Sequence, residues 1–73
     1  MMIITYMKPN LIIHSDVMIS GHIRIMDKQK HILRAIDVST ESFVSIKTKA
    51  EWPKDIEVEV SSGAMTTRKE ISI

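Results

Sequence analysis

Three histidines and one pair of glutamates are the side chains in this sequence whose types and spacing come closest to those of a metal site or an acid–base catalytic site. His14 and Asp16 stand two positions apart, so on a strand they would share a face, and His22 on a neighbouring strand would complete a set of metal ligands. Neither a second ligand pair nor a helical HExxH pattern accompanies them. We therefore expect all three to face solvent, and we predict no metal and no other cofactor.

His31, Glu57 and Glu59 are the candidates for acid–base catalysis. No nucleophile or partner carboxylate stands at a defined spacing from His31, and the two glutamates are neighbours on one short segment, whereas glycosidase carboxylates flank a cleft. A chain of 73 residues also has little interior in which to form a pocket. We predict that the protein is not an enzyme, with no catalytic residue and no small-molecule substrate.

The single tryptophan points instead to binding. Trp52 precedes Pro53, where it either covers one end of a small core or anchors a partner protein, since tryptophan is enriched at interfaces. With three apolar residues of the central segment it forms the predicted partner-binding set, which is Trp52, Ile23, Ile25 and Met26.

Basic residues gather in the same central segment, at Arg24, Lys28, Lys30 and Arg34. This set is the predicted nucleic-acid-binding surface of an alternative function, although no aromatic residue lies among them. The first half of the chain is net basic and the second half net acidic, which suits assembly steered by complementary charge.

Alternation of apolar and polar residues is the dominant pattern, and it predicts strands. The alternation is most regular at residues 56–60. Over residues 17–25 it places apolar residues at the odd-numbered positions, and we expect a break or bulge at Ser20-Gly21. Residues 3–6 and 11–13 are denser in apolar side chains, which suggests burial on both faces. Polar turn segments, including 27–30 and 39–42, recur about every ten to fourteen residues, as in a meander, barrel or sandwich.

The central segment should form a hairpin of residues 22–26 and 31–38. A four-residue loop at 27–30 places Ile25 opposite Ile32 but leaves Ile23 opposite Arg34, so we expect either a bulge or an apolar cluster on each face. For residues 40–52 the sequence is compatible with either a strand or a helix. Thr40 is a fitting helix cap, whereas the β-branched content favours a strand.

Length and composition limit the remaining choices. The sequence has 44% apolar residues, ten basic and nine acidic groups, and no cysteine, which excludes a disulfide scaffold and a strongly charged tail. We expect one domain, residues 1–73, whose thin core favours self-association. No apolar run is long enough for a membrane span and no basic leader is present, so we predict no membrane contact and a cytoplasmic or viral setting.

Residues 17–27, followed by 32–37, resemble the first Sm motif, a bent strand with a glycine and a downstream acidic residue. The resemblance implies a small nucleic-acid-binding barrel. The first loop lacks the family's aromatic residue and asparagine, and Ser61-Ser62-Gly63 lacks the basic residue before glycine in the second motif. We therefore transfer no residue role from it.

These patterns predict an all-β fold, a small barrel or sandwich of five to seven short, mostly antiparallel strands. The function that we expect is a non-enzymatic binding or assembly module. It would self-associate or dock on a protein partner through strand edges and an apolar face. The alternative is a small Sm-like or OB-like barrel that binds nucleic acid through the hairpin around residues 24–34.

Overall fold

The computed structural model describes all 73 residues as five strands without a helix. The strands are β1 (Met2–Met7), β2 (Asn10–Met26), β3 (Ile32–Lys47), β4 (Asp55–Ser62) and β5 (Met65–Ser72). All pairs are antiparallel, so the all-β fold class is confirmed at the lower end of the expected strand number. β2 and β3 differ from the short strands expected, since they have 17 and 16 residues. No segment forms a helix of the length and apolarity that a membrane crossing requires.

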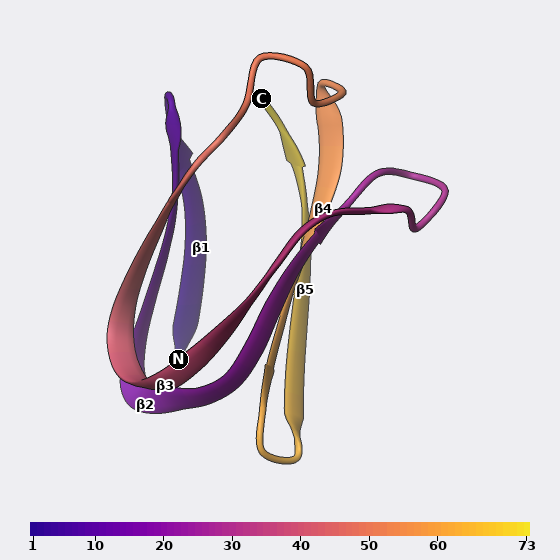
Figure 1. Cartoon of the computed structure of the whole chain (residues 1–73). Helices are drawn as coiled ribbons and strands as arrows, with labels where there is room; N and C mark the ends of the chain where they lie inside the picture. The colour runs from indigo at the N-terminus through magenta and orange to yellow at the C-terminus, as the bar shows by residue number, and fades with distance from the viewer.

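β2 organises the sheet. One of its edges pairs with β3, while the other pairs with β1 over residues 10–15 and with β4 over residues 21–26. β5 continues the sheet beyond β4. Because β2 bends between these two halves, the sheet curls into a half-barrel, and β1 stands as one arm facing the arm of β4 and β5 (Figure 1).

The core lies inside this half-barrel. Alternate residues of each strand point to one face, so the odd-numbered apolar residues of β2, except Val17 at the bend, turn inward together with the even-numbered ones of β4. Trp52, in the connection between β3 and β4, covers the core with 9% of its surface exposed. The cluster comprises Ile4, Leu11, Ile13, Ile19, Ile23, Ile25, Val38, Ile46, Trp52, Ile56, Val58, Val60 and Ile71.

Gly21 marks the bend of β2, where register shifts fall between His14 and Ile19 and between Ile19 and Gly21. A Cβ at Gly21 would lie 1.9 Å from the carbonyl oxygen of Ser61, so only glycine allows β4 to approach so closely. The irregularity predicted at Ser20-Gly21 is thus confirmed as a register shift between β2 and β3, while β2 itself continues through it.

The central hairpin contains a bulge. Ile25 lies opposite Arg34 and Ile23 opposite Ile36, while Met26 lies opposite Ile32. The predicted pairing of Ile25 with Ile32 is therefore wrong, and the predicted bulge is confirmed. The extra residue, Leu33, shifts the register so that two isoleucines meet on the inner face.

The segment 40–52 is not helical. Its first part continues β3 to Lys47, and residues 48–54 form turns and irregular chain. The turn predicted at residues 39–42 is instead a bend inside β3, where Thr40 adopts a φ of 58°. The β-branched side chains of this segment favour the extended chain, as the strand alternative required.

Candidate interaction surface

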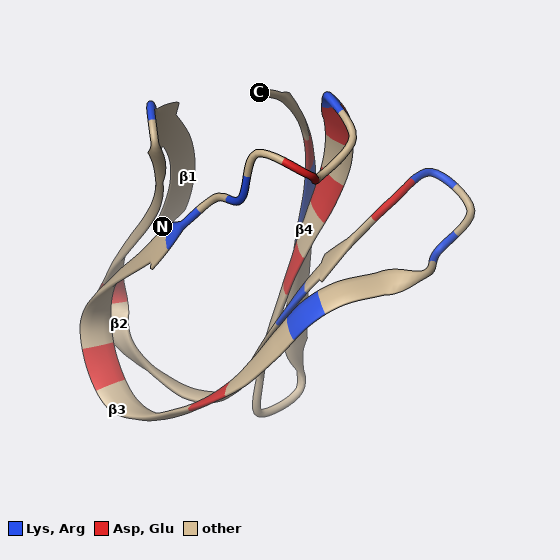
Figure 2. Cartoon of the chain, turned by 45° about the horizontal axis from the view of Figure 1, so that its top comes forward, with Lys and Arg blue, Asp and Glu red and all other residues tan.

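The outer, convex face of the sheet has two halves of opposite character. The second part of β2, the first part of β3, and β4 and β5 form a charged half. β1, the first part of β2 and the end of β3 form the other half. Figure 2 shows charged bands along β4 and the adjoining part of β2, whereas β1 carries none.

Glu59 is the centre of the charged half, because it lies directly between Arg24 and Arg68 on the neighbouring strands. Nε of Arg24 donates to Oε1 at 2.8 Å, and Nε of Arg68 donates to Oε2 at 2.8 Å. The glutamate side chain is only 4% exposed. The hydrogen bonds from Arg24, and then those from Arg68, hold the pKa of Glu59 below its usual range against the opposing effect of burial. This carboxylate is therefore a structural cross-link of three strands.

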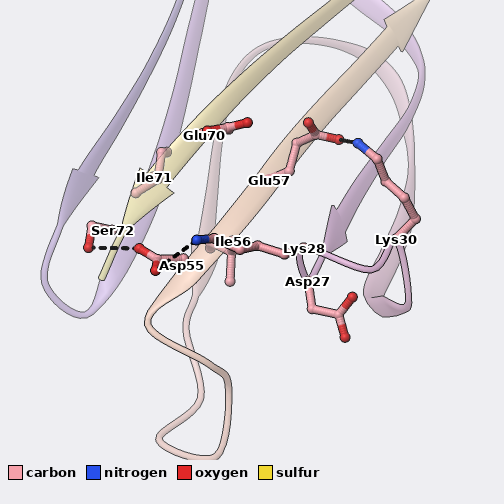
Figure 3. Close-up of a pocket in the computed structure, with 9 residues that line it drawn as sticks. All are labelled: Asp27, Lys28, Lys30, Asp55, Ile56, Glu57, Glu70, Ile71 and Ser72. Carbon is pink, nitrogen blue, oxygen red and sulfur yellow. Dashed lines mark hydrogen bonds and ion pairs between the residues drawn. The ribbon is translucent and has the colours of Figure 1, made fainter.

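Two further basic residues of the predicted nucleic-acid surface, Lys28 and Lys30, lie at the hairpin end of the sheet (Figure 3). Nζ of Lys28 is 3.4 Å from Asp55, and Nζ of Lys30 is 2.6 Å from Glu57. Figure 3 shows these two lysines reaching across to β4 around a hollow that is also lined by Glu70. Arg24, Lys28 and Lys30 are thus each paired with an acid, which reduces their attraction for a polyanion.

Arg34 is the one member of that set without an ion pair. The four basic residues lie in and next to the hairpin, as their spacing predicts. β4 places carboxylates opposite three of them. Its binding of nucleic acid stays a prediction.

Asp27 organises the hairpin loop. Its Oδ1 accepts hydrogen bonds from the backbone N–H groups of Gln29 at 2.9 Å and His31 at 2.8 Å, and its Oδ2 lies 3.0 Å from Nδ1 of His31. Desolvation alone would raise the pKa of Asp27, but the hydrogen bonds from His31 and Gln29 together outweigh it and lower the pKa. His31 therefore contacts a loop carboxylate that already accepts two backbone hydrogen bonds.

The predicted partner-binding residues lie in the interior. Ile23 and Ile25 are 0% exposed, Met26 5% and Trp52 9%. A partner would touch them only if the fold opened, so their binding role stays a prediction. The metal candidates are also dispersed, because no three histidine, aspartate or glutamate side chains lie close enough to hold an ion.

The other half of the outer face, where β1, β2 and β3 lie side by side, carries a single formal charge, that of Lys47, and exposes several apolar side chains. Three cross-strand rows of β1, β2 and β3 form it, and we call this surface the outer patch. The rows are Ile3–His14–Phe43, Thr5–Ile12–Ser45 and Met7–Asn10–Lys47.

Three large side chains of the outer patch remain open to solvent. Ile3 is 49% exposed, Phe43 55% and Met7 61%. The dense apolar runs at residues 3–6 and 11–13 were the signal for this surface, but they suggested burial on both faces. The half-barrel covers only the inner one.

An unpaired sheet edge adjoins the outer patch. β3 pairs with β2 alone, so the backbone groups on its other side meet no strand of this chain. Free edges of this kind are templates for pairing with another chain. The exposed apolar face and the free edge meet at residues 43–47.

No protein-family model, curated protein or solved structure matches this chain.

Proposed function

We propose that this protein is a non-enzymatic assembly module, two copies of which pack together through the outer patch. The observation that carries the proposal is the set of three half-exposed apolar side chains, Ile3, Met7 and Phe43, on a face with only one charged side chain. Single exposed apolar residues are ordinary, whereas three of them around the half-buried Ile12 on one face favour an interaction surface.

The arrangement of the outer patch suits a second copy as the occupant. Ile12 is at its centre, and Lys47, the only lysine, arginine or carboxylate in it, is at a corner. When two patches stack about a two-fold axis that passes through Ile12 parallel to the strands, Lys47 lies against Met7 of the second copy, and with an axis perpendicular to the strands it lies against Phe43. In both arrangements the two lysines stay apart, and an ammonium group above the Phe43 ring is itself favourable.

The strength of such a dimer follows from the exposed apolar surface. Complete burial of a large apolar side chain contributes roughly 1.5–3 kcal/mol, so each half-exposed one contributes roughly 1 kcal/mol. Six of them across two copies contribute roughly 6 kcal/mol, against a cost of association on the order of 4–15 kcal/mol. The remaining contacts of the two faces must supply the rest. We expect at most a weak dimer, with a dissociation constant between about 10 μM and 1 mM.

Sedimentation equilibrium over about 10 μM to 1 mM tests this proposal. We expect a monomer–dimer equilibrium in the parent chain and a monomer in Phe43→Lys. Met65→Lys is the matched control, because Met65 is 58% exposed, much like Phe43 at 55%, but lies at the far β4–β5 turn. Circular dichroism confirms that each variant is folded.

Two results would overturn the proposal. One is a parent chain that remains monomeric up to about 1 mM. The other is a Met65→Lys variant that loses association as fully as Phe43→Lys does, since the patch would then have no special part in it.

We also propose a cytoplasmic location, which a chain without cysteine suits. Fractionation of cells that produce the protein tests it.

A further inference from the structure

Four lysines surround a hollow at the mouth of the half-barrel. Lys8 comes from the β1–β2 turn, Lys47 from the end of β3, and Lys49 and Lys54 from the β3–β4 connection. The rings of Tyr6 and Trp52 line the same hollow. We call this site the lysine mouth.

Backbone hydrogen bonds hold the segments that carry these lysines. The N–H and the hydroxyl of Thr48 both donate to the carbonyl oxygen of Pro9 at 2.8 Å, which joins the β3–β4 connection to the β1–β2 turn. The N–H of Ile73 donates to the carbonyl oxygen of Lys54 at 2.7 Å. The lysines therefore project from a frame that is already assembled before any ligand arrives.

The lysine mouth carries unpaired charge, in contrast to the hairpin end. None of its four lysines forms an ion pair, while Arg24, Lys28 and Lys30 each have an acidic partner. Glu51 is the one acidic residue of the connecting segment 48–54, and it does not line the hollow. Four free ammonium groups around one hollow create the positive potential that attracts a polyanion.

We infer that the lysine mouth binds the phosphate backbone of a single-stranded nucleic acid. Lysine ammonium groups contact phosphates without regard to base sequence, and aromatic rings beside them stack on bases that are not already paired. The partly exposed ring of Tyr6 offers such a face. The inference does not depend on the proposed dimer, since only Lys47 belongs to both surfaces.

Fluorescence polarisation with labelled oligo(dT) and oligo(rU), at about 50 and 200 mM salt, tests the inference. Four phosphate contacts on a single strand predict a slope of about −3 for the logarithm of affinity against that of salt concentration. Affinity should therefore fall roughly 50-fold between the two salt concentrations.

The decisive variant is Lys49→Gln combined with Lys54→Gln, which should halve the salt slope and weaken binding at least tenfold in low salt. The matched control, Lys28→Gln with Lys30→Gln, removes the same charge from the hairpin end and should leave affinity and slope unchanged. Neither pair lies in the outer patch, so the monomer–dimer equilibrium of both variants should equal that of the parent chain.

Trp52 supplies a second readout, because it is the only tryptophan and lines the lysine mouth. Its emission should change during the titration and saturate together with the polarisation. Absence of oligonucleotide binding at low salt would overturn the inference. Equal loss of oligonucleotide affinity in the Lys28→Gln, Lys30→Gln control would also overturn it, because the hairpin surface would then be the binding site. Tighter binding to anionic lipid vesicles than to either oligonucleotide would overturn it as well.

Discussion

Replacement of Glu59 by glutamine should destabilise the fold by about 2 kcal/mol at neutral pH, and this loss should disappear in acid. The carboxylate is 4% exposed and accepts hydrogen bonds from Arg24 and Arg68. Hydrogen bonds to charged groups contribute roughly 1.5–3 kcal/mol each. The two arginines are 40% and 58% exposed and regain water when the charge is removed, so the pair together falls near the lower limit.

The dependence on pH follows from the sign of the pKa shift. The folded-state pKa of Glu59 lies below its ordinary value, so its stabilising contribution is complete above the unfolded-state pKa of about 4.3. That contribution is lost as the pH falls through the folded-state pKa. Glu59→Gln and the parent chain should therefore differ at pH 7 and converge as the pH decreases below about 4.

Urea unfolding followed by Trp52 fluorescence, at one fixed protein concentration, measures this difference. Thermal unfolding at pH 7 should show a decrease of roughly 10 °C in Tm. Glu70→Gln is the matched control, because Glu70 is exposed and forms no ion pair, and it should change stability by less than about 0.5 kcal/mol. An equal loss at pH 7 and in acid would refute the electrostatic reasoning and leave only a packing effect.

Three further substitutions test the fold and the outer patch. Gly21→Ala should cost about 3 kcal/mol or more, because its Cβ would lie 1.9 Å from the Ser61 carbonyl oxygen; a chain of unchanged urea midpoint would contradict this. Thr40→Gly should raise the free energy of unfolding by up to about 1 kcal/mol, and with it the urea midpoint, since φ is 58° there; a lower midpoint would argue against strain. His14→Leu should tighten the dimer several-fold in sedimentation by making the row from Ile3 to Phe43 apolar throughout; unchanged affinity would count against the patch.

The period of two along the sequence was sufficient to predict the fold class, because the inward-facing residues of β2 and β4 are mostly apolar. It did not predict the lengths of β2 and β3. The polar residues 39–42 are typical of a turn, yet the strand continues through them with Thr40 in the left-handed region. A bulge changes strand direction without ending the ladder, and local composition does not distinguish the two.

Long-range register explains why the surfaces were harder to predict. The charge of Arg24 is visible in the sequence, but its partner Glu59 is 35 positions away and lies opposite only because β2 pairs with β4. The lysine mouth likewise joins residues from the β1–β2 turn and the β3–β4 connection. The dense apolar run at residues 11–13 predicted burial on two faces, and only the curvature of the sheet decides which face is covered.

The most direct test of the assembly proposal is an isotope-filtered nuclear Overhauser experiment on mixed labelled and unlabelled protein at about 1 mM. Packing through the outer patch predicts intermolecular contacts between the Ile12 side chains of the two copies and from Phe43 to Ile3 or Lys47. Contacts confined to the backbone of residues 43–47 would mean that the free β3 edge pairs instead. That result, or no intermolecular contact at all, would contradict the account.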